Sequence, residues 1–263
     1  MKALERQICY AAFLDQLRSA SARVLLLDYD GTLAPFTVDR SLALPYPNVA
    51  ERLMRIMQTG TRVVLISGRP AREVVGLVGI QPHPEIWGSH GVERLRRDDS
   101  YEICQIPLQQ QAGLSLAVQL LQAVQLDSQT EVKPGSVAVH WRGLTPDQVD
   151  EIKSKIRHLW LPVLSEYPLS LLEFDGGLEL RVPGCDKGDA IRTILKETSP
   201  NAAVAYLGDD QTDEDAFRAL KRRGLTALVR PQSRSTAADI WLRPPQELIE
   251  FFNNWLQASG GEL

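Results

Sequence analysis

The pattern of apolar and polar positions in the first hundred residues alternates between two kinds of segment. Short continuous apolar runs, such as Val24–Leu27 and Val63–Ile66, are typical of strands buried on both faces of a parallel sheet. The longer segments between them place apolar residues at helical spacing, for example Val49, Leu53 and Ile56. This part of the chain is predicted to form strands at 23–28, 61–66 and 86–87 and helices at 4–17, at 47–58 and after Pro70. Such alternation favours a parallel sheet with helices on both faces.

The pattern changes after about residue 100 and returns later in the chain. Helices are predicted at 109–125 and 147–159, and paired strands at 130–133, 136–142, 163–166 and 171–174, which together indicate a small α+β module. The first pattern then resumes with strands at 178–182, 204–207 and 225–229 and with helices that begin at Lys187, Asp213 and Pro244. We therefore expect one α/β domain formed by residues 1–105 and 177–263, with an inserted α+β domain at 106–176.

Acidic side chains gather where two of the predicted strands end. Asp28 and Asp30 directly follow the first strand, and because side chains alternate along an extended backbone, both would point into one crevice. Asp209 and Asp210 follow a later strand, and the carboxyl ends of parallel strands meet at one edge of the sheet. Carboxylates gathered there repel one another unless a cation lies between them, and Mg²⁺ is the simplest oxygen-seeking ion. For Asp213 two interpretations stay open, a part in the metal site or the start of a helix.

Two further elements at the same edge suit an anion. Ser67 and Arg69 follow the strand at 61–66, and a hydroxyl beside free backbone N–H groups at a helix start can bind an anion. A Ser-Gly turn is also ordinary turn chemistry. Lys187 is expected in the first turn of a helix that Asp186 caps, where a cation opposes the helix dipole. It is either a solvated surface lysine or an anion clamp, and the nearby acids favour the clamp.

Composition narrows the class of protein. The chain has 263 residues and a formal net charge of −4, so it lacks the basic footprint of a nucleic-acid-binding protein. Cys9, Cys104 and Cys185 are an odd, scattered set without CxxC spacing, which suggests neither a disulfide framework nor a zinc site. The apolar runs are too short to span a bilayer, and no cleavable signal precedes the first strand. We expect a reduced, cytoplasmic protein that binds neither nucleic acid nor membrane.

The chemistry-bearing residues follow an order that resembles a known group of proteins. Four elements resemble the motifs of the haloacid dehalogenase (HAD) superfamily of phosphohydrolases, namely Asp28-x-Asp30-Gly-Thr, Ser67, Lys187 and Gly208-Asp-Asp. Longer segments resemble the trehalose-6-phosphate phosphatases, namely Asp28 to Pro35, Ser67-Gly-Arg69, Gly88 to Glu93 and Gly208 to Phe217. The resemblance covers about residues 23–230 and implies an α/β fold, with a Rossmann-like (HAD-like) parallel-sheet core and an inserted α+β cap of type C2.

The resemblance also implies a role for each residue of the core. Asp28 would be the nucleophile that forms an aspartyl-phosphate, and Asp30 the general acid and base. The cofactor would be Mg²⁺, held by Asp28, by the backbone carbonyl of Asp30 and by Asp209. Ser67 and Lys187 would hold the phosphoryl oxygens. Asp213 is a further candidate metal ligand, and Arg69 a candidate substrate-binding residue.

The predicted insert carries a candidate specificity site. Its strands place one set of polar side chains on a common face, while Val137, Val139 and Trp141 lie on the other face. Periodicity alone favours simple solvent exposure of the polar face. The resemblance implies instead a lid that binds the sugar through Glu131, Lys133, Ser136, His140 and Arg142, with Glu179 as a further sugar-contacting residue after the insert.

The expected activity is hydrolysis of trehalose 6-phosphate, a small sugar phosphate, to trehalose and phosphate. One alternative is a phosphatase for another sugar phosphate, such as sucrose phosphate or glucosylglycerol phosphate. A second alternative is a non-catalytic domain that senses phosphosugars beside a synthase. Such a domain could dispense with the nucleophile, yet this sequence keeps the full set of core residues, namely Asp28, Asp30, Lys187 and Asp209. Functional coupling to a trehalose-phosphate synthase is a possible partnership.

Overall fold

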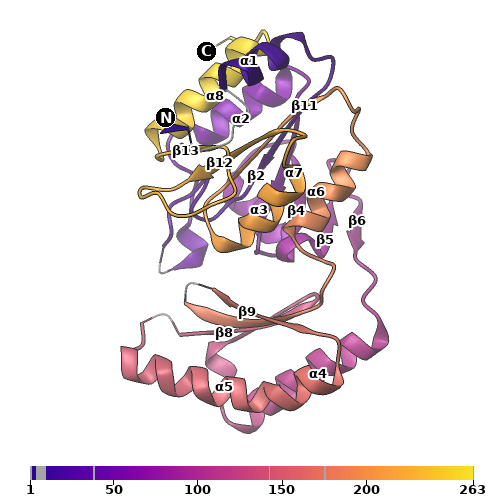
Figure 1. The fold of residues 1–263 in the computed structure, drawn as a ribbon, viewed down its shortest axis with the longest axis vertical. Helices are drawn as coiled ribbons and strands as arrows, with labels where there is room; N and C mark the ends of the chain where they lie inside the picture. Colours follow the sequence, from indigo (N-terminus) through magenta and orange to yellow (C-terminus); the bar gives the residue numbers. More distant parts are fainter. Residues whose placement is uncertain (1, 4–9, 38, 142, 175, 263) are drawn as a thin grey trace. The chain divides into compact units, whose positions relative to one another are not determined.

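The computed structural model describes residues 2–3, 10–37, 39–141, 143–174 and 176–262. The chain divides into two compact units (Figure 1). The core unit consists of Met1–Glu102 and Asp186–Leu263, and the insert unit consists of Ile103–Cys185. The insert unit is thus continuous in sequence, whereas the core unit is assembled from two separate stretches.

The core unit is built on a nine-stranded sheet in the order β1-β13-β12-β11-β2-β3-β4-β5-β6. The six strands from β13 to β4 run parallel, and β1 and β5 pair antiparallel at the two sides. The bounds are β1 (Lys2–Ala3), β2 (Arg23–Leu27), β3 (Arg62–Ile66), β4 (Glu85–Gly88), β5 (Glu93–Leu95), β6 (Tyr101–Ile103), β11 (Ala203–Gly208), β12 (Leu225–Val229) and β13 (Ile240–Leu242). This arrangement confirms the predicted parallel-sheet core.

Helices cover both faces of this sheet. Alternate residues of β2 serve the two faces, since Leu25 and Leu27 belong to one buried apolar cluster and Val24 and Leu26 to another. The first cluster packs under α1 (Tyr10–Ser19), α2 (Val49–Gln58), α3 (Ala71–Val78) and α8 (Gln246–Ala258). The second packs under α6 (Lys187–Lys196) and α7 (Glu214–Leu220), which lie side by side in Figure 1. Double-sided burial explains the continuous apolar runs Val24–Leu27 of β2 and Val63–Ile66 of β3.

The insert unit is a four-stranded antiparallel sheet with two long helices. Its strand order is β7-β8-β10-β9, with bounds β7 (Thr130–Lys133), β8 (Ser136–His140), β9 (Ser170–Phe174) and β10 (Gly177–Arg181). The helices α4 (Leu108–Ala123) and α5 (Pro146–Glu166) pack together (Figure 1). One face of the sheet, which includes Val137, Val139, Leu178 and Leu180, forms a separate apolar core with them. The other face is therefore left for polar side chains.

Two predictions about the insert were wrong. The strand expected at 163–166 is the last turn of α5, because Ile156, Trp160 and Val163 continue the buried face of the helix past Pro162. The strand expected at 178–182 does not resume the parallel sheet. It is β10, which pairs antiparallel with β8 and β9, so the chain leaves the insert unit only after Cys185 rather than at residue 176. Leu178 and Leu180 of this strand join the apolar core of the insert unit, whereas Glu179 lies on the opposite, polar face of its sheet.

Other differences concern short or terminal elements. The structure adds the strands β1, β5, β6 and β13 and short 3-10 turns at Arg40–Leu42, Ser89–Gly91, Asp127–Gln129 and Gln211–Asp213. Two or three residues of strand offer too little periodicity to be recognised in sequence. The helix predicted at 4–17 is described only from Tyr10 onward, and residues 4–9 lie outside the described residues. Within the described residues, no helix combines the length and apolar character needed to cross a bilayer.

Candidate active site

Three predicted site residues follow neighbouring strands of the core sheet. Asp28 follows β2, Ser67 follows β3 and Asp209 follows β11. Because β2 lies between β3 and β11 in parallel register, the three residues lie at one edge of the sheet. All three are buried. The structure therefore brings together the strand-end residues that the sequence singled out.

Lys187 joins this group from the start of α6. Asp186 caps the helix and exchanges hydrogen bonds with Asp189, which leaves Lys187 as the first helical residue. Its Nζ atom donates to Oδ1 of Asp28 at 2.7 Å and to Oδ1 of Asp213 at 2.6 Å. The side chain is only 3% exposed. Lys187 is therefore a buried cation between two carboxylates rather than a solvated surface lysine.

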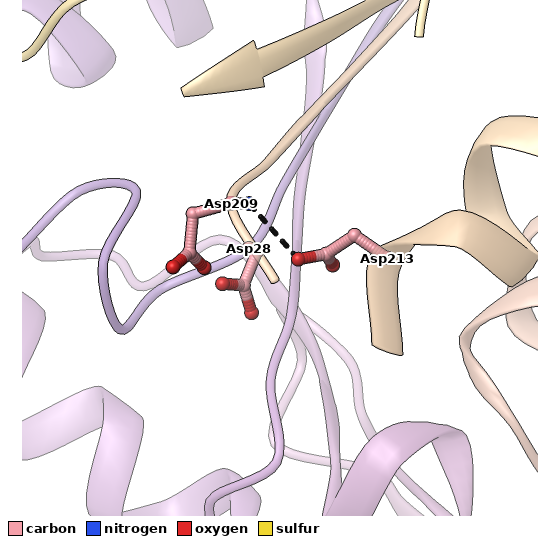
Figure 2. Close-up of side chains that lie close together, drawn as sticks. All are labelled: Asp28, Asp209 and Asp213. Atoms are coloured by element: carbon pink, nitrogen blue, oxygen red, sulfur yellow. Dashed lines mark hydrogen bonds between the residues drawn. The ribbon is translucent and has the colours of Figure 1, made fainter. Parts of the chain in front are cut away.

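Asp213 is surrounded by hydrogen-bond donors. Besides Lys187, Oδ1 accepts from the hydroxyl of Tyr206, and Oδ2 accepts from the backbone N–H groups of Asp209 and Asp210, each at 2.9 Å. Figure 2 shows the bond between Asp209 and Asp213. Asp213 thus fixes both Lys187 and the backbone that carries Asp209.

The group nevertheless fits a divalent cation. Asp28, Asp209 and Asp213 each offer one carboxylate oxygen, and these oxygens lie within 4.8 Å of one another (Figure 2). Oδ1 of Asp209 is buried and has no hydrogen-bond partner among the described residues. A buried, unpaired carboxylate oxygen is costly unless a ligand satisfies it. All three candidate side-chain ligand atoms are carboxylate oxygens, which suits Mg²⁺.

The electrostatics of the group agree with this fit. Burial raises the pKa of the Asp28 carboxyl to about 7, although the Lys187 ammonium acts against the rise. Burial, together with the charges of Asp28 and Asp213, raises the pKa of Asp209 well above its ordinary value. Without a cation the carboxylates thus favour protons, and a bound divalent ion would favour their charged forms instead.

Gly31 makes the approach of Asp209 possible. Its φ of +79° lies in the left-handed region that disfavours other residues. A Cβ atom at this position would lie 2.2 Å from Oδ2 of Asp209. The neighbouring Thr32 donates its hydroxyl to Oδ2 of Asp28 at 3.4 Å. The absence of a side chain at Gly31 therefore leaves room for the Asp209 carboxylate beside the turn, and Thr32 contacts Asp28.

Asp30 has a different partner from the other acids. Nε of Arg69 donates to Oδ2 of Asp30 at 2.7 Å, and Nη2 donates to Oδ1 at 2.6 Å, which is a two-pronged ion pair. Nη1 of Arg69 donates to the carbonyl of Arg40 at 2.8 Å and to the carboxylate of Glu73. The guanidinium, predicted from sequence to bind substrate, is thus engaged with protein groups and holds Asp30.

The polar residues predicted for the insert form one connected cluster. Glu131 and Glu179 lie in register on either side of Ala138, which places them on the same face of the sheet. Oε2 of Glu131 contacts Nε2 of His140 at 2.8 Å and Nζ of Lys133 at 3.4 Å.

The second half of this cluster centres on Glu179. Oε1 of Glu179 accepts from the hydroxyl of Ser136 at 2.7 Å and lies 4.0 Å from Nζ of Lys133. The side chains of Glu179 and Lys133 are only 3% and 7% exposed, so this face is not simply solvated. Glu179 lies within the insert sheet rather than after it. Arg142 lies outside the described residues.

Sequence reasoning missed two side chains that shape the core site. Tyr206 lies in β11 and reaches Asp213, but a tyrosine within an apolar strand carries no signal beyond strand propensity. Arg234 donates through Nη2 to the carbonyl of Asp210 at 2.7 Å and through Nη1 to the carboxylate of Glu214. It lies in a loop far along the chain, where only the fold shows its neighbours.

Comparisons with known proteins place the chain in a family. The family model described as trehalose-phosphatase matches residues 26–243. The trehalose-phosphate phosphatase of Mycobacterium leprae is 30% identical over 257 residues, which cover 89% of this chain and 57% of that protein. The alpha,alpha-trehalose-phosphate synthase [UDP-forming] B of Dictyostelium discoideum is 29% identical over 216 residues, which cover 78% of this chain and only 26% of that protein.

Solved structures support the same placement at the level of the fold. The C-terminal domain of the C. albicans trehalose-6-phosphate phosphatase superposes with a TM-score of 0.77 at 20% identity, and the match covers 99% of each chain. A phosphatase of the HAD superfamily from Bacteroides thetaiotaomicron superposes with a TM-score of 0.62 at 18% identity, covering 90% of this chain and 96% of that chain. These likenesses confirm the predicted HAD-like fold, and the family model covers most of the sequence. The chain belongs to the trehalose-phosphatase family.

Proposed function

We propose that this protein is a Mg²⁺-dependent phosphatase that hydrolyses trehalose 6-phosphate to trehalose and phosphate. One observation carries the proposal: Asp28 lies against Lys187 at the strand ends, within reach of the unpaired buried oxygen of Asp209. A nucleophilic carboxylate, a fixed cation and a metal-ligating carboxylate are the groups that phosphoryl transfer needs. Family membership supports the substrate, since the Mycobacterium leprae relative carries this activity in its name.

The chemistry divides among the residues of the core. The Asp28 carboxylate attacks phosphorus and forms an aspartyl-phosphate, while the bond between phosphorus and the sugar oxygen breaks. Asp30 gives its proton to that oxygen, then takes a proton from the water that attacks the aspartyl-phosphate and releases phosphate. Lys187 and Ser67 hold the phosphoryl oxygens. Bound Mg²⁺, held by Asp28, Asp209 and the Asp30 carbonyl, would offset the repulsion between carboxylate and phosphate.

Arg69 fits a positioning role better than a substrate-binding one. Its two-pronged contact fixes both oxygens of Asp30 and spans 39 residues of sequence. An acid and base held in this way is orientated before the substrate arrives, and it must leave the arginine to transfer a proton. We therefore assign Arg69 to the orientation of Asp30.

The polar cluster of the insert unit supplies groups for the sugar. Glu131, Lys133, Ser136, His140 and Glu179 offer both donors and acceptors on one sheet face. A disaccharide presents many hydroxyls, and a site that pairs each of them rejects analogues that lack one. This cluster is the proposed basis for preferring trehalose 6-phosphate over other sugar phosphates.

The activity test is phosphate release from trehalose 6-phosphate with Mg²⁺, compared with excess chelator and with sucrose and glucosylglycerol phosphates. We expect turnover of trehalose 6-phosphate to be fastest and to be lost on chelation. Equal or faster turnover of the other sugar phosphates would replace the substrate assignment. Absence of release from every sugar phosphate in the presence of Mg²⁺ would favour a non-catalytic binding domain.

Lys133→Met should separate recognition of the sugar from the chemistry. The substitution removes a buried donor of the insert cluster, and loss of one hydrogen bond to a charged group corresponds to roughly a 10- to 100-fold loss in kcat/KM for trehalose 6-phosphate. Hydrolysis of p-nitrophenyl phosphate, which lacks the sugar, should change far less. Lys153→Met is the matched control, because Lys153 is in the same unit but pairs with the exposed Glu173. Equal losses on both substrates would contradict the sugar-binding role.

A further inference from the structure

Two cysteines meet where the chain enters and leaves the insert unit. Cys104 follows β6, one residue after the unit begins, and Cys185 is its last residue. They are 81 positions apart in sequence, yet their Sγ atoms lie 2.6 Å from each other. Cys104 is exposed, whereas Cys185 is buried. Sequence spacing gave no sign of this pair, because two distant cysteines meet only through the fold.

The geometry suits a covalent bond between the two sulfurs. A disulfide has an S–S length of about 2.04 Å, so little movement separates the observed contact from a bond. Metal binding is a poorer explanation for the pair. Among the described residues, the group of three or more possible metal ligands lies in the core unit and contains neither cysteine.

We propose that Cys104 and Cys185 form a reversible redox pair that low-molecular-weight disulfides, such as glutathione disulfide, oxidise. The exposed Cys104 thiol loses its proton and attacks the glutathione disulfide, which breaks that S–S bond and releases one glutathione. Cys185 then loses its proton and attacks Cys104 sulfur, which forms the protein disulfide and releases the second glutathione. Two protein thiols are oxidised, and one glutathione disulfide is reduced to two thiols. A small dithiol reverses the reaction.

Oxidation would close the insert unit into a covalent loop. The closed loop runs from residue 104 to residue 185 and contains the whole sheet of the unit and both of its helices. Cross-linking residues this far apart restricts the unfolded chain more than the folded one. We therefore expect the oxidised protein to unfold at a higher temperature than the reduced protein, by roughly 5–10 °C.

The test incubates the 263-residue protein with glutathione disulfide and compares it with Cys9→Ser, Cys104→Ser and Cys185→Ser. The wild type has three cysteines and should lose two reactive thiols, and a peptide pair that joins Cys104 to Cys185 should be found by mass spectrometry. Cys9→Ser should behave in the same way. Cys185→Ser should stop at a glutathione adduct on Cys104, and Cys104→Ser should form no linked peptide.

Each outcome decides the proposal. A dithiol should restore the thiols and remove the rise in unfolding temperature in the wild type and in Cys9→Ser. Three reactive thiols in the wild type after this treatment would overturn the proposal, and so would linked peptides that contain Cys9. A persistent glutathione adduct on Cys104 of the wild type would overturn it too, because Cys185 would then not resolve the mixed disulfide.

Discussion

Replacing Asp28 with asparagine should lower the rate of phosphate release by at least roughly four orders of magnitude, while the protein stays folded. Losing a nucleophile typically costs a factor of this size or more, because the remaining groups only bind and orientate. The fold should survive because Lys187 keeps its contact with Asp213. Burial already disfavours the charged form of Asp28, as its raised pKa indicates, so a neutral amide of the same size adds no buried charge.

This experiment combines a turnover assay with thermal unfolding of the same samples. Asp215→Asn is the matched control, since Asp215 lies two positions after Asp213, in the first turn of α7, and pairs with Arg218 at 3.1 Å on the helix surface. We expect the control to retain turnover. Wild-type turnover in Asp28→Asn would eliminate the aspartyl-phosphate mechanism. A collapse of the unfolding temperature would show instead that Asp28 holds the fold.

Lys187→Met should have the largest effect on stability, with a loss of about 3–5 kcal/mol in the free energy of unfolding. The substitution removes the cation between Asp28 and Asp213 and leaves two buried carboxylates uncompensated. Turnover should fall as well, because the proposed phosphate clamp is gone. Lys196→Met is the matched control, since Lys196 is the exposed last residue of the same helix.

The pH dependence of this variant provides a second readout. Lys187 lowers the pKa of Asp28, so its removal should raise that pKa further above the unfolded value. A carboxyl whose folded pKa is raised favours the folded state at low pH and loses that contribution as pH rises through the folded value. Lys187→Met should therefore be destabilised more at pH 8 than at pH 5. A second substitution, Asp28→Asn, should recover part of the loss. A pH-independent loss without such recovery would contradict the charge explanation.

The gathering of acidic residues at the carboxyl ends of the strands could be predicted from sequence, because it depends on short segments of the chain. Asp28 and Asp209 each end an apolar run, and parallel strands place such positions together. The partner of Arg69 could not be predicted in this way. Its contact with Asp30 depends on the direction of a long side chain across a turn, which residue spacing does not specify.

The insert shows a second limit of sequence reasoning. Val163 follows a proline and lies in a short apolar segment, and this local pattern favours the start of a strand. Its true place in α5 depends on packing against the insert core, which outweighs the local signal. The apolar positions of β10 are consistent with either sheet, and only its partners β8 and β9 decide between them. Tertiary packing therefore decided what the local pattern left open.

The discontinuity of the core unit has a consequence for how the protein folds. Lys187 meets Asp213 across 26 residues, but it meets Asp28 across 159 residues. The insert unit is one uninterrupted stretch, so its sheet can form before the two halves of the core are joined. Pairing of β2 with β11 must then close a loop that contains the whole insert, and such long-range closures are slow. The proposed nucleophile and its proposed clamp thus meet only after this distant closure, so recovery of activity during refolding should follow recovery of helical signal.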